Sequence, residues 1–105
     1  MITTTNSVVK MGKKDVKFFK VGDRVAYFGP GAYAQFTNVS ENTAFALPQS
    51  LSFKEGAAMV LQGLTVQYLS RTSYPIKAGD VVLIHAGAGG IGGLLIQVAK
   101  AIGAT

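Results

Sequence analysis

The chain has 105 residues, a net charge of +5 at pH 7, 49% hydrophobic residues and 14% charged residues. This composition is too apolar for a disordered segment, and the length allows one modest core that buries somewhat over ~60% of the unfolded surface. Because the chain has no cysteine and a single histidine, His85, it cannot build a disulfide framework or a Cys/His zinc site alone.

The N-terminal sequence MITTTNSVVK lacks the basic and long apolar regions of a signal peptide. The longest apolar stretch, which is rich in glycine, is shorter than the ~20 residues of a membrane span. We therefore expect a soluble, cytoplasmic protein with no membrane partner.

Half of the ten cationic residues are lysines clustered near the start of the chain: Lys10, Lys13, Lys14, Lys17 and Lys20. A basic patch can attract phosphate. No arginine or aromatic ladder interleaves the lysines, as nucleic-acid readers usually show. The pattern favours a solvated turn over a nucleic-acid partner.

The first half of the sequence predicts short β-strands separated by turns that contain glycine or proline. The expected strands are residues 8–11, 25–28, 32–39 and 44–47, and the expected turns are 12–15, 21–24 and 29–31. Pro48 ends the last of these strands.

Helical spacing begins after Pro48. Ser52 and Glu55 fit a capping box, in which the serine accepts a backbone N–H and the glutamate reaches back to the helix start. We expect Gly63 to interrupt this helix and a second helical piece to cover residues 65–70. The apolar positions that mark the first piece are Ala57, Ala58, Leu61 and Leu64.

The last part of the chain reads as a turn over 77–80, a strand, a glycine loop and a helix. Residues 81–84 are all apolar, which is typical of a strand buried on both faces of a parallel sheet, and we expect the strand to end at His85. A helix is expected over 91–102, with Gly103 as its C-terminal glycine. Its predicted packing stripe consists of Ile91, Leu94, Leu95, Val98 and Ile102. Residues 104–105 would open the next strand.

Five glycines fall within residues 87–93, and Gly87-Ala88-Gly89-Gly90-Ile91-Gly92 matches the G-x-G-x-x-G pattern. Between a strand and a helix this pattern predicts a dinucleotide site, in which Gly87 allows the sharp turn, Gly89 admits the pyrophosphate and Gly92 allows tight packing. Backbone N–H groups near Gly90 and Ile91 would meet the phosphate. The competing interpretation is a tight turn without a ligand.

The ordered motifs resemble the quinone oxidoreductase and zeta-crystallin branch of the medium-chain dehydrogenases/reductases. They are Gly79-Asp80, Leu83, the glycine motif, Gln97 and Lys100, preceded by the motifs at 19–26, 31–36 and 62–66. The resemblance implies an α/β protein with a partial, β-rich GroES-like catalytic domain over 1–62. The start of a Rossmann NAD(P)-binding domain, truncated, would follow over 63–105.

The same resemblance implies NADPH-dependent reduction of a quinone or another conjugated carbonyl, in a protein that is a homodimer at full length. Gly89, Gly90, Ile91 and Gly92 would bind the cofactor, and Thr65 would lie near its nicotinamide. Thr65 could instead be a helix-start hydroxyl that caps its own turn. No residue is predicted to be catalytic.

Zinc-dependent members of the superfamily carry a zinc-binding cysteine at the position of Leu61 and a structural cysteine cluster, so the resemblance favours the zinc-free branch. We assign no chemistry to His85. NAD and NADP cannot be separated from this chain by residue chemistry.

Two alternatives stay open. One is an enoyl or alkenal double-bond reductase of the same superfamily. The other is a non-catalytic truncated remnant or a small basic binding module. Because most of the cofactor and substrate contacts would lie outside these residues, we expect little or no turnover from the chain alone.

Overall fold

The computed structural model describes residues 2–8, 10–12 and 16–105 and shows a mixed α/β chain. The chain divides into two compact units, Met1–Val60 and Leu61–Thr105. The boundary falls inside helix α1 (Phe53–Gln67). In the part of the chain that is described, no helix has the length and apolar character needed to cross a membrane.

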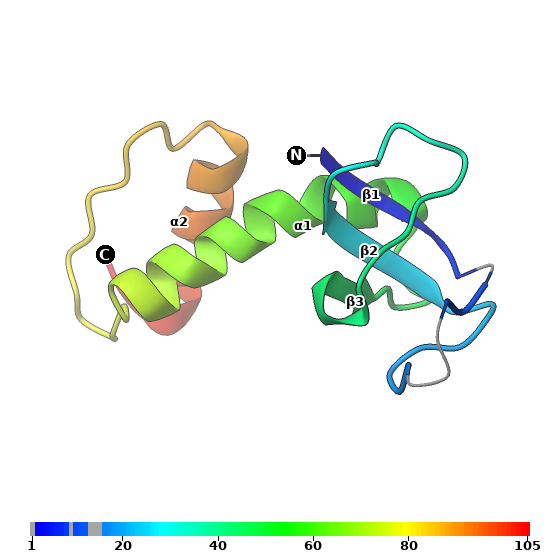
Figure 1. Cartoon of the computed structure of the whole chain (residues 1–105). Helices are drawn as coiled ribbons and strands as arrows, with labels where there is room; N and C mark the ends of the chain where they lie inside the picture. The colour runs from blue at the N-terminus through cyan, green and yellow to red at the C-terminus, as the bar shows by residue number, and fades with distance from the viewer. Residues whose placement is uncertain (1, 9, 13–15) are drawn as a thin grey trace. The chain divides into compact units, whose positions relative to one another are not determined.

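The first unit contains a three-stranded antiparallel sheet with the order β1-β2-β3 (Figure 1). The strands are β1 (Ile2–Ser7), β2 (Arg24–Gly29) and β3 (Ala44–Ala46). A short 3₁₀ helix, η1 (Glu41–Thr43), leads into β3. Since β2 is paired along both edges, it is the centre of this unit.

The core of the first unit lies on β2 and just after β3, where Ala26, Tyr27 and Leu47 are buried. Arg24 donates hydrogen bonds to the carbonyls of Pro48 (2.9 Å) and Leu51 (2.7 Å). Its guanidinium also lies 4.5 Å from the centre of the Phe53 ring. This one side chain therefore fastens the sheet to the segment that enters α1.

The predicted strands at 25–28 and 44–47 are confirmed within a residue at each end. The predicted strand at 32–39 is wrong, because this segment is irregular, with bends over 33–36, and exposes Tyr33 and Phe36. The predicted strand at 8–11 is also wrong: the strand that pairs with β2 is Ile2–Ser7. Val9 and residues 13–15, which include Lys13, Lys14 and most of one expected turn, lie outside the described residues.

Helix α1 begins at the predicted capping box. The Ser52 backbone N–H donates to the Glu55 carboxylate (2.7 Å), and the Ser52 hydroxyl accepts from the Glu55 N–H (3.2 Å). Gly63 does not interrupt the helix, so the expected break is wrong. Residues 65–70 are helical as predicted, but they continue α1 and are not a separate piece. A glycine costs a helix only about 1 kcal/mol, which the surrounding residues offset. A π-helix, η2 (Tyr68–Ser73), follows directly.

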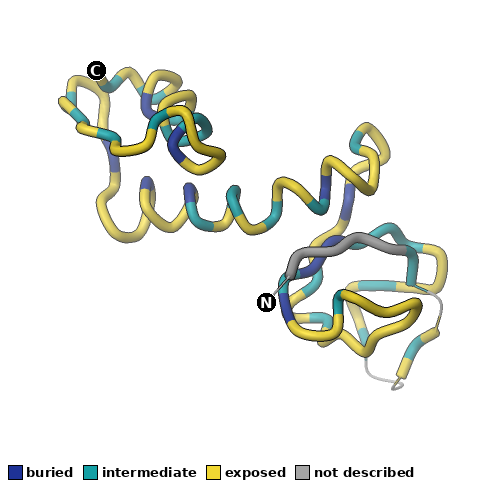
Figure 2. Tube along the Cα trace, turned by 90° about the horizontal axis from the view of Figure 1, so that it is seen from above, coloured by how far each residue is buried: buried dark blue, intermediate teal, exposed yellow. Residues whose placement is uncertain are grey.

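The second unit ends with helix α2 (Gly90–Ile102), which confirms the predicted helix. Gly103 is its C-cap, with a left-handed φ of 94° that suits glycine. The predicted packing stripe is half-buried at best, and the residues that are buried in α2 are Gly92 and Ala99. Val66, Ile76 and Ser70 are the other buried residues of this unit (Figure 2).

The predicted strand at 81–85 is not formed, and its expected burial on both faces is contradicted. Val81 and Leu83 are 88% and 83% exposed. Two ladder-like bonds are present, from the Val82 N–H to the Thr105 carbonyl (2.8 Å) and from the Thr105 N–H to the Asp80 carbonyl (2.8 Å). In the described part of the chain, these bonds link the segment to a single residue, Thr105. A buried parallel strand instead needs a neighbouring strand on each side.

Candidate functional site

The glycine-rich loop of the second unit turns at Ala86. Ala86 has φ 53°, in the left-handed region, and its carbonyl accepts a hydrogen bond from the Gly89 N–H (2.8 Å). Gly87, which the motif predicts to allow the sharp turn, lies within this turn, but the left-handed residue is Ala86. The absence of a side chain at Gly87 leaves room for Ile96, since a Cβ at position 87 would lie 3.0 Å from Cδ1 of Ile96.

Gly92 brings α2 against the loop backbone. A Cβ on Gly92 would overlap the Ala86 carbonyl oxygen and lie 2.8 Å from the Ala86 carbonyl carbon and 2.9 Å from the Gly87 Cα. Such distances are shorter than any real Cβ contact. The close approach that the motif predicts at Gly92 is thus present. Here, however, α2 packs against a turn and not against a strand.

The start of α2 has free backbone donors. Gly89 is the N-cap, has no side chain to cap the helix, and no acidic residue lies in the first turn. The first intrahelical bond runs from the Gly93 N–H to the Gly89 carbonyl (2.8 Å). The N–H groups of Gly90, Ile91 and Gly92 therefore have no intrahelical partner, and the described residues offer them no other. Free donors of this kind at a helix N-terminus suit an anion.

These donors lie beside a cavity of 560 Å³, which is the size of a small-molecule or cofactor pocket. All of its lining residues belong to the second unit: Leu61, Gln62, Leu69, Leu83, Ile84, His85, Ala86, Gly89, Gly90, Ile91, Gly92 and Leu95. The lining is mainly apolar, and the exceptions are Gln62, His85 and the backbone of the loop. The cavity can hold an organic group next to an anion.

The predicted cofactor residues Gly89, Gly90, Ile91 and Gly92 all line this cavity, but Thr65 does not. The Thr65 hydroxyl donates to the Leu61 carbonyl (2.8 Å) inside α1. Because Thr65 lies close to the C-terminal end of α1, the alternative in which it caps a helix start is wrong.

Gln62 is a lining residue that sequence reasoning missed. Its side chain packs against Gly90, where an added Cβ would lie 2.7 Å from Cδ and 2.8 Å from Oε1 of Gln62. The motif at 62–66 contains Gln62, but no spacing in the sequence connects it with the glycine loop.

The described residues contain no group of three or more His, Cys, Asp or Glu side chains that could hold a metal ion. Leu61, at the position compared with the zinc-binding cysteine, is 43% exposed and lines the cavity. His85 also lines the cavity, and the described residues give its ring no hydrogen-bond partner. Among the described residues, the polar groups that the cavity presents are therefore Gln62, His85 and the backbone of the loop.

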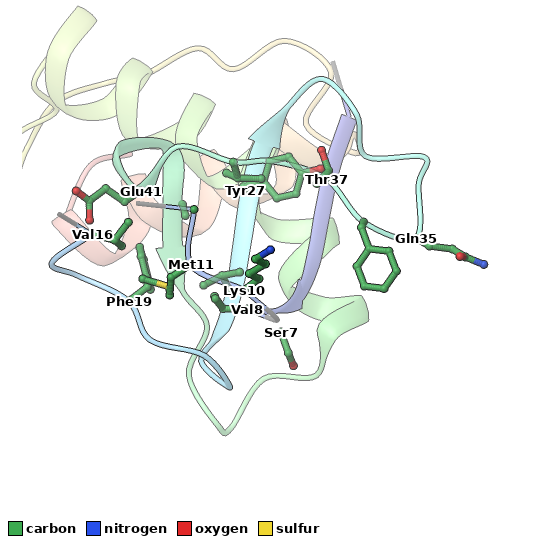
Figure 3. A pocket seen from close by; sticks show the side chains of 15 residues that line it. Ser7, Val8, Lys10, Met11, Val16, Phe19, Tyr27, Gln35, Thr37 and Glu41 are labelled. Carbon is green, nitrogen blue, oxygen red and sulfur yellow. The ribbon is translucent and has the colours of Figure 1, made fainter. Parts of the chain in front are cut away.

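A second cavity, of 240 Å³, lies in the first unit (Figure 3). Its lining includes Val8, Phe19, Val25, Tyr27 and Glu41. The Tyr27 hydroxyl is buried without a hydrogen-bond partner in the described part of the chain. Since the hydroxyl is itself shielded, it offers nothing to a molecule in the cavity. The Glu41 carboxylate already accepts from the Lys17 N–H (2.9 Å) and the Phe18 N–H (3.3 Å).

No model of a known protein family matches the chain. Among curated proteins, it is 46% identical to a probable quinone oxidoreductase of Schizosaccharomyces pombe over 95 residues, which are 90% of this chain and 29% of that protein. The chain thus spans about a third of the length of the curated relatives it matches.

Solved structures give the same result. The structure of Escherichia coli quinone oxidoreductase complexed with NADPH matches with a TM-score of 0.89 and 43% identity, covering 99% of this chain and 32% of that one. The CurK enoyl reductase matches with a TM-score of 0.88 and 33% identity, covering 98% of this chain and 31% of that one.

Proposed function

Because this chain belongs to the quinone oxidoreductase family, we propose that it supplies the diphosphate-binding segment of an NADPH-dependent reductase that acts on quinones. The bound cofactor would supply a hydride to the substrate. The residues of this chain bind and orient the cofactor, and none of them moves a proton.

The observation that carries the proposal is the open start of α2. The N–H groups of Gly90, Ile91 and Gly92 have no partner in the described chain, and Gly89 and Gly90 present no side chain that would keep a ligand away. Oriented amide donors at a helix N-terminus suit a diphosphate. The adjacent cavity of 560 Å³ has room for the ribose that follows it.

The finer assignments belong to the same proposal. We assign residues 1–62 to a GroES-like catalytic domain and 63–105 to the first part of a Rossmann domain. Thr65 would lie near the nicotinamide in the assembled site. We further propose a zinc-free reductase, since leucine at position 61 cannot ligate zinc, and a cytoplasmic homodimer as the active form.

The 105 residues by themselves are proposed to be inactive. The chain spans about a third of its relatives, and hydride transfer requires cofactor and substrate to be held together at near-contact distance. The described residues provide only one side of a cofactor site. Cofactor binding, rather than turnover, is therefore the property to measure on this chain.

Calorimetric titration of the chain with NADPH and with inorganic pyrophosphate tests the proposal. We expect NADPH to bind, with shifts of the Gly90, Ile91 and Gly92 amide signals in an NMR spectrum recorded at saturation. NADPH binding that leaves these three signals in place, or no NADPH binding at millimolar concentration, overturns it. Quinone-dependent NADPH oxidation by the chain alone would overturn the proposed inactivity.

A second candidate is an enoyl or alkenal double-bond reductase, favoured by the match to the CurK enoyl reductase. Both activities would use the same diphosphate site, so the described residues do not separate them. Turnover of a quinone and an enone by a form of the protein extended to the length of its relatives distinguishes them. Preference for the enone would replace the quinone assignment.

A further inference from the structure

Gln62 approaches the glycine loop from α1. Both lie in the second unit, and the carboxamide packs against Gly90, so closely that an added Cβ on Gly90 would be 2.8 Å from Oε1 of Gln62. Gly90 is the first residue of α2 and carries one of the free N–H groups. The amide of Gln62 is therefore beside the proposed diphosphate position.

The carboxamide of Gln62 has no hydrogen-bond partner among the described residues, although the residue is half-buried. A glutamine side chain carries two N–H donors and one acceptor, and polar groups that leave bulk water are usually paired. The buried Ser70 of this unit follows that rule, since its hydroxyl donates to the Val66 carbonyl (2.7 Å). Gln62 faces a cavity instead.

We infer that Gln62 is a cofactor-binding residue whose Nε2 donates a hydrogen bond to the diphosphate, an inference that rests on the proposed function. Its donors come from α1, outside the glycine loop, and complement the backbone donors of α2. A phosphate oxygen offers only acceptors, so Gln62 turns its amino group, not its carbonyl, toward the anion. The anion is thereby held from two helices.

A purely structural role makes a different prediction. If Gln62 only fills space over Gly90, Gln62→Leu, which keeps an apolar side chain there but has no donor, binds like the unaltered chain. If Gln62 donates to the anion, Gln62→Leu loses one hydrogen bond to a charged group and binds more weakly. Gln62→Glu places a carboxylate beside the phosphate and weakens binding in either case, so it tests only whether the side chain lies next to the anion. The affinity of Gln62→Leu therefore separates the two roles.

The experiment is calorimetric titration of the unaltered chain and both variants with NADPH and with inorganic pyrophosphate. We expect Gln62→Leu to weaken binding about tenfold and Gln62→Glu about a hundredfold. Gln67→Leu and Gln67→Glu are matched controls, because Gln67 is exposed on the same helix and does not line the cavity. They should bind like the unaltered chain, and circular dichroism should show equal helix content in all five proteins.

The outcomes separate this inference from the proposed function. NADPH binding by Gln62→Leu that equals binding by the Gln67 variants overturns the inference and leaves the function standing. Binding of pyrophosphate without NADPH removes the NADPH assignment, and the affinity of Gln62→Leu for pyrophosphate then decides the role of Gln62. A chain that binds neither probe overturns both.

Discussion

Helices α1 and α2 begin in opposite ways. At α1 the Ser52 backbone N–H and hydroxyl both donate to the Glu55 carboxylate, at 2.7 Å each, and the Glu55 N–H returns a bond to the hydroxyl. At α2 the N-cap is Gly89, which has no side chain, and the first turn has no acidic residue. The start of α1 is capped by the side chains of Ser52 and Glu55, whereas the start of α2 has no side-chain cap.

This difference is why we place the proposed diphosphate site at α2. A side-chain cap stabilises a helix by about 1 kcal/mol, and α2 does without one. In its place the chain has a strained Ala86 and a glycine at each point where the loop and α2 approach closely. Because no side chain caps α2, the helix loses this stabilisation, but its first N–H groups stay free for the ligand that we propose.

The largest expected effect comes from closing the space at Gly92. Gly92→Ala puts a Cβ into the Ala86 carbonyl, so the loop or α2 must shift. We expect a loss of about 1–3 kcal/mol of stability in the second unit, together with loss of NADPH binding. Amide hydrogen exchange of α2 measures the first and calorimetry the second.

Gly93→Ala is the control for this change, because its Cβ would lie at an ordinary contact distance, 3.6 Å from the Gly87 carbonyl oxygen. In a helix interior this substitution should stabilise by up to about 1 kcal/mol. Equal destabilisation by both variants would contradict the close approach assigned to Gly92.

The next effect comes from giving α2 the kind of cap that α1 has. In Gly89→Asp a carboxylate takes the place that we assign to the diphosphate and accepts from the free N–H groups. We expect NADPH to bind at least about tenfold more weakly while α2 gains protection from hydrogen exchange.

Gly89→Ala controls for the added Cβ, which would lie 3.2 Å from the Ala86 carbonyl oxygen. It should weaken NADPH binding less than Gly89→Asp, because it brings no competing acceptor. If the alanine variant weakens binding as much as the aspartate variant, the loss comes from crowding and not from occupied donors.

Two similar turns show how far the sequence could predict the fold. Lys20-Val21-Gly22-Asp23 and Lys77-Ala78-Gly79-Asp80 have the same pattern, and in each the aspartate accepts from the lysine N–H, at 2.9 and 2.8 Å. Each glycine has a positive φ, 95° and 87°. Such turns are local and were predicted correctly.

The segments after these turns were both predicted as strands, and only the first is one. Residues 24–29 pair with β1 and β3, whereas the backbone of residues 81–84 is hydrogen-bonded, within the described part of the chain, only to Thr105. A run of apolar residues predicts an extended chain but does not specify its neighbours. Strand formation depends on pairing between distant residues, which periodicity does not contain.

The candidate site was predictable to a similar extent. The pattern of glycines predicts the loop, the helix start and the close approach at Gly92, because each follows from local sterics. It did not give the left-handed turn at Ala86, since alanine rarely adopts that conformation. Nor did it give Gln62, whose place beside Gly90 depends on how α1 packs within the second unit.

A smaller effect is expected from removing the cap of α1. Ser52→Ala loses the hydroxyl that bonds to Glu55, which should destabilise the start of α1 by about 1 kcal/mol and leave NADPH affinity unchanged. Hydrogen exchange of the first turns of α1 measures this. Ser50→Ala, two residues earlier and exposed, should have no effect, and equal losses in both variants would argue against the cap.

The smallest effect is the response of the two helix starts to pH. The backbone N–H and the hydroxyl of Ser52 donate to the Glu55 carboxylate and hold its pKa below the ordinary value of a glutamate. A lowered pKa in the folded state means that the cap stabilises the helix above the ordinary pKa. This contribution is lost as the pH falls through the pKa of the folded state.

On acidification from about pH 6 to about pH 3, the first turn of α1 should therefore lose protection from hydrogen exchange. Glu55→Gln keeps the hydrogen-bonding shape of the cap without a titrating group, so its first turn should lose less. The start of α2 has no acidic residue and should serve as the internal reference. An equal loss at both helix starts would mean that general acid unfolding, and not the Glu55 cap, causes the response, because only α1 holds its first donors with a carboxylate.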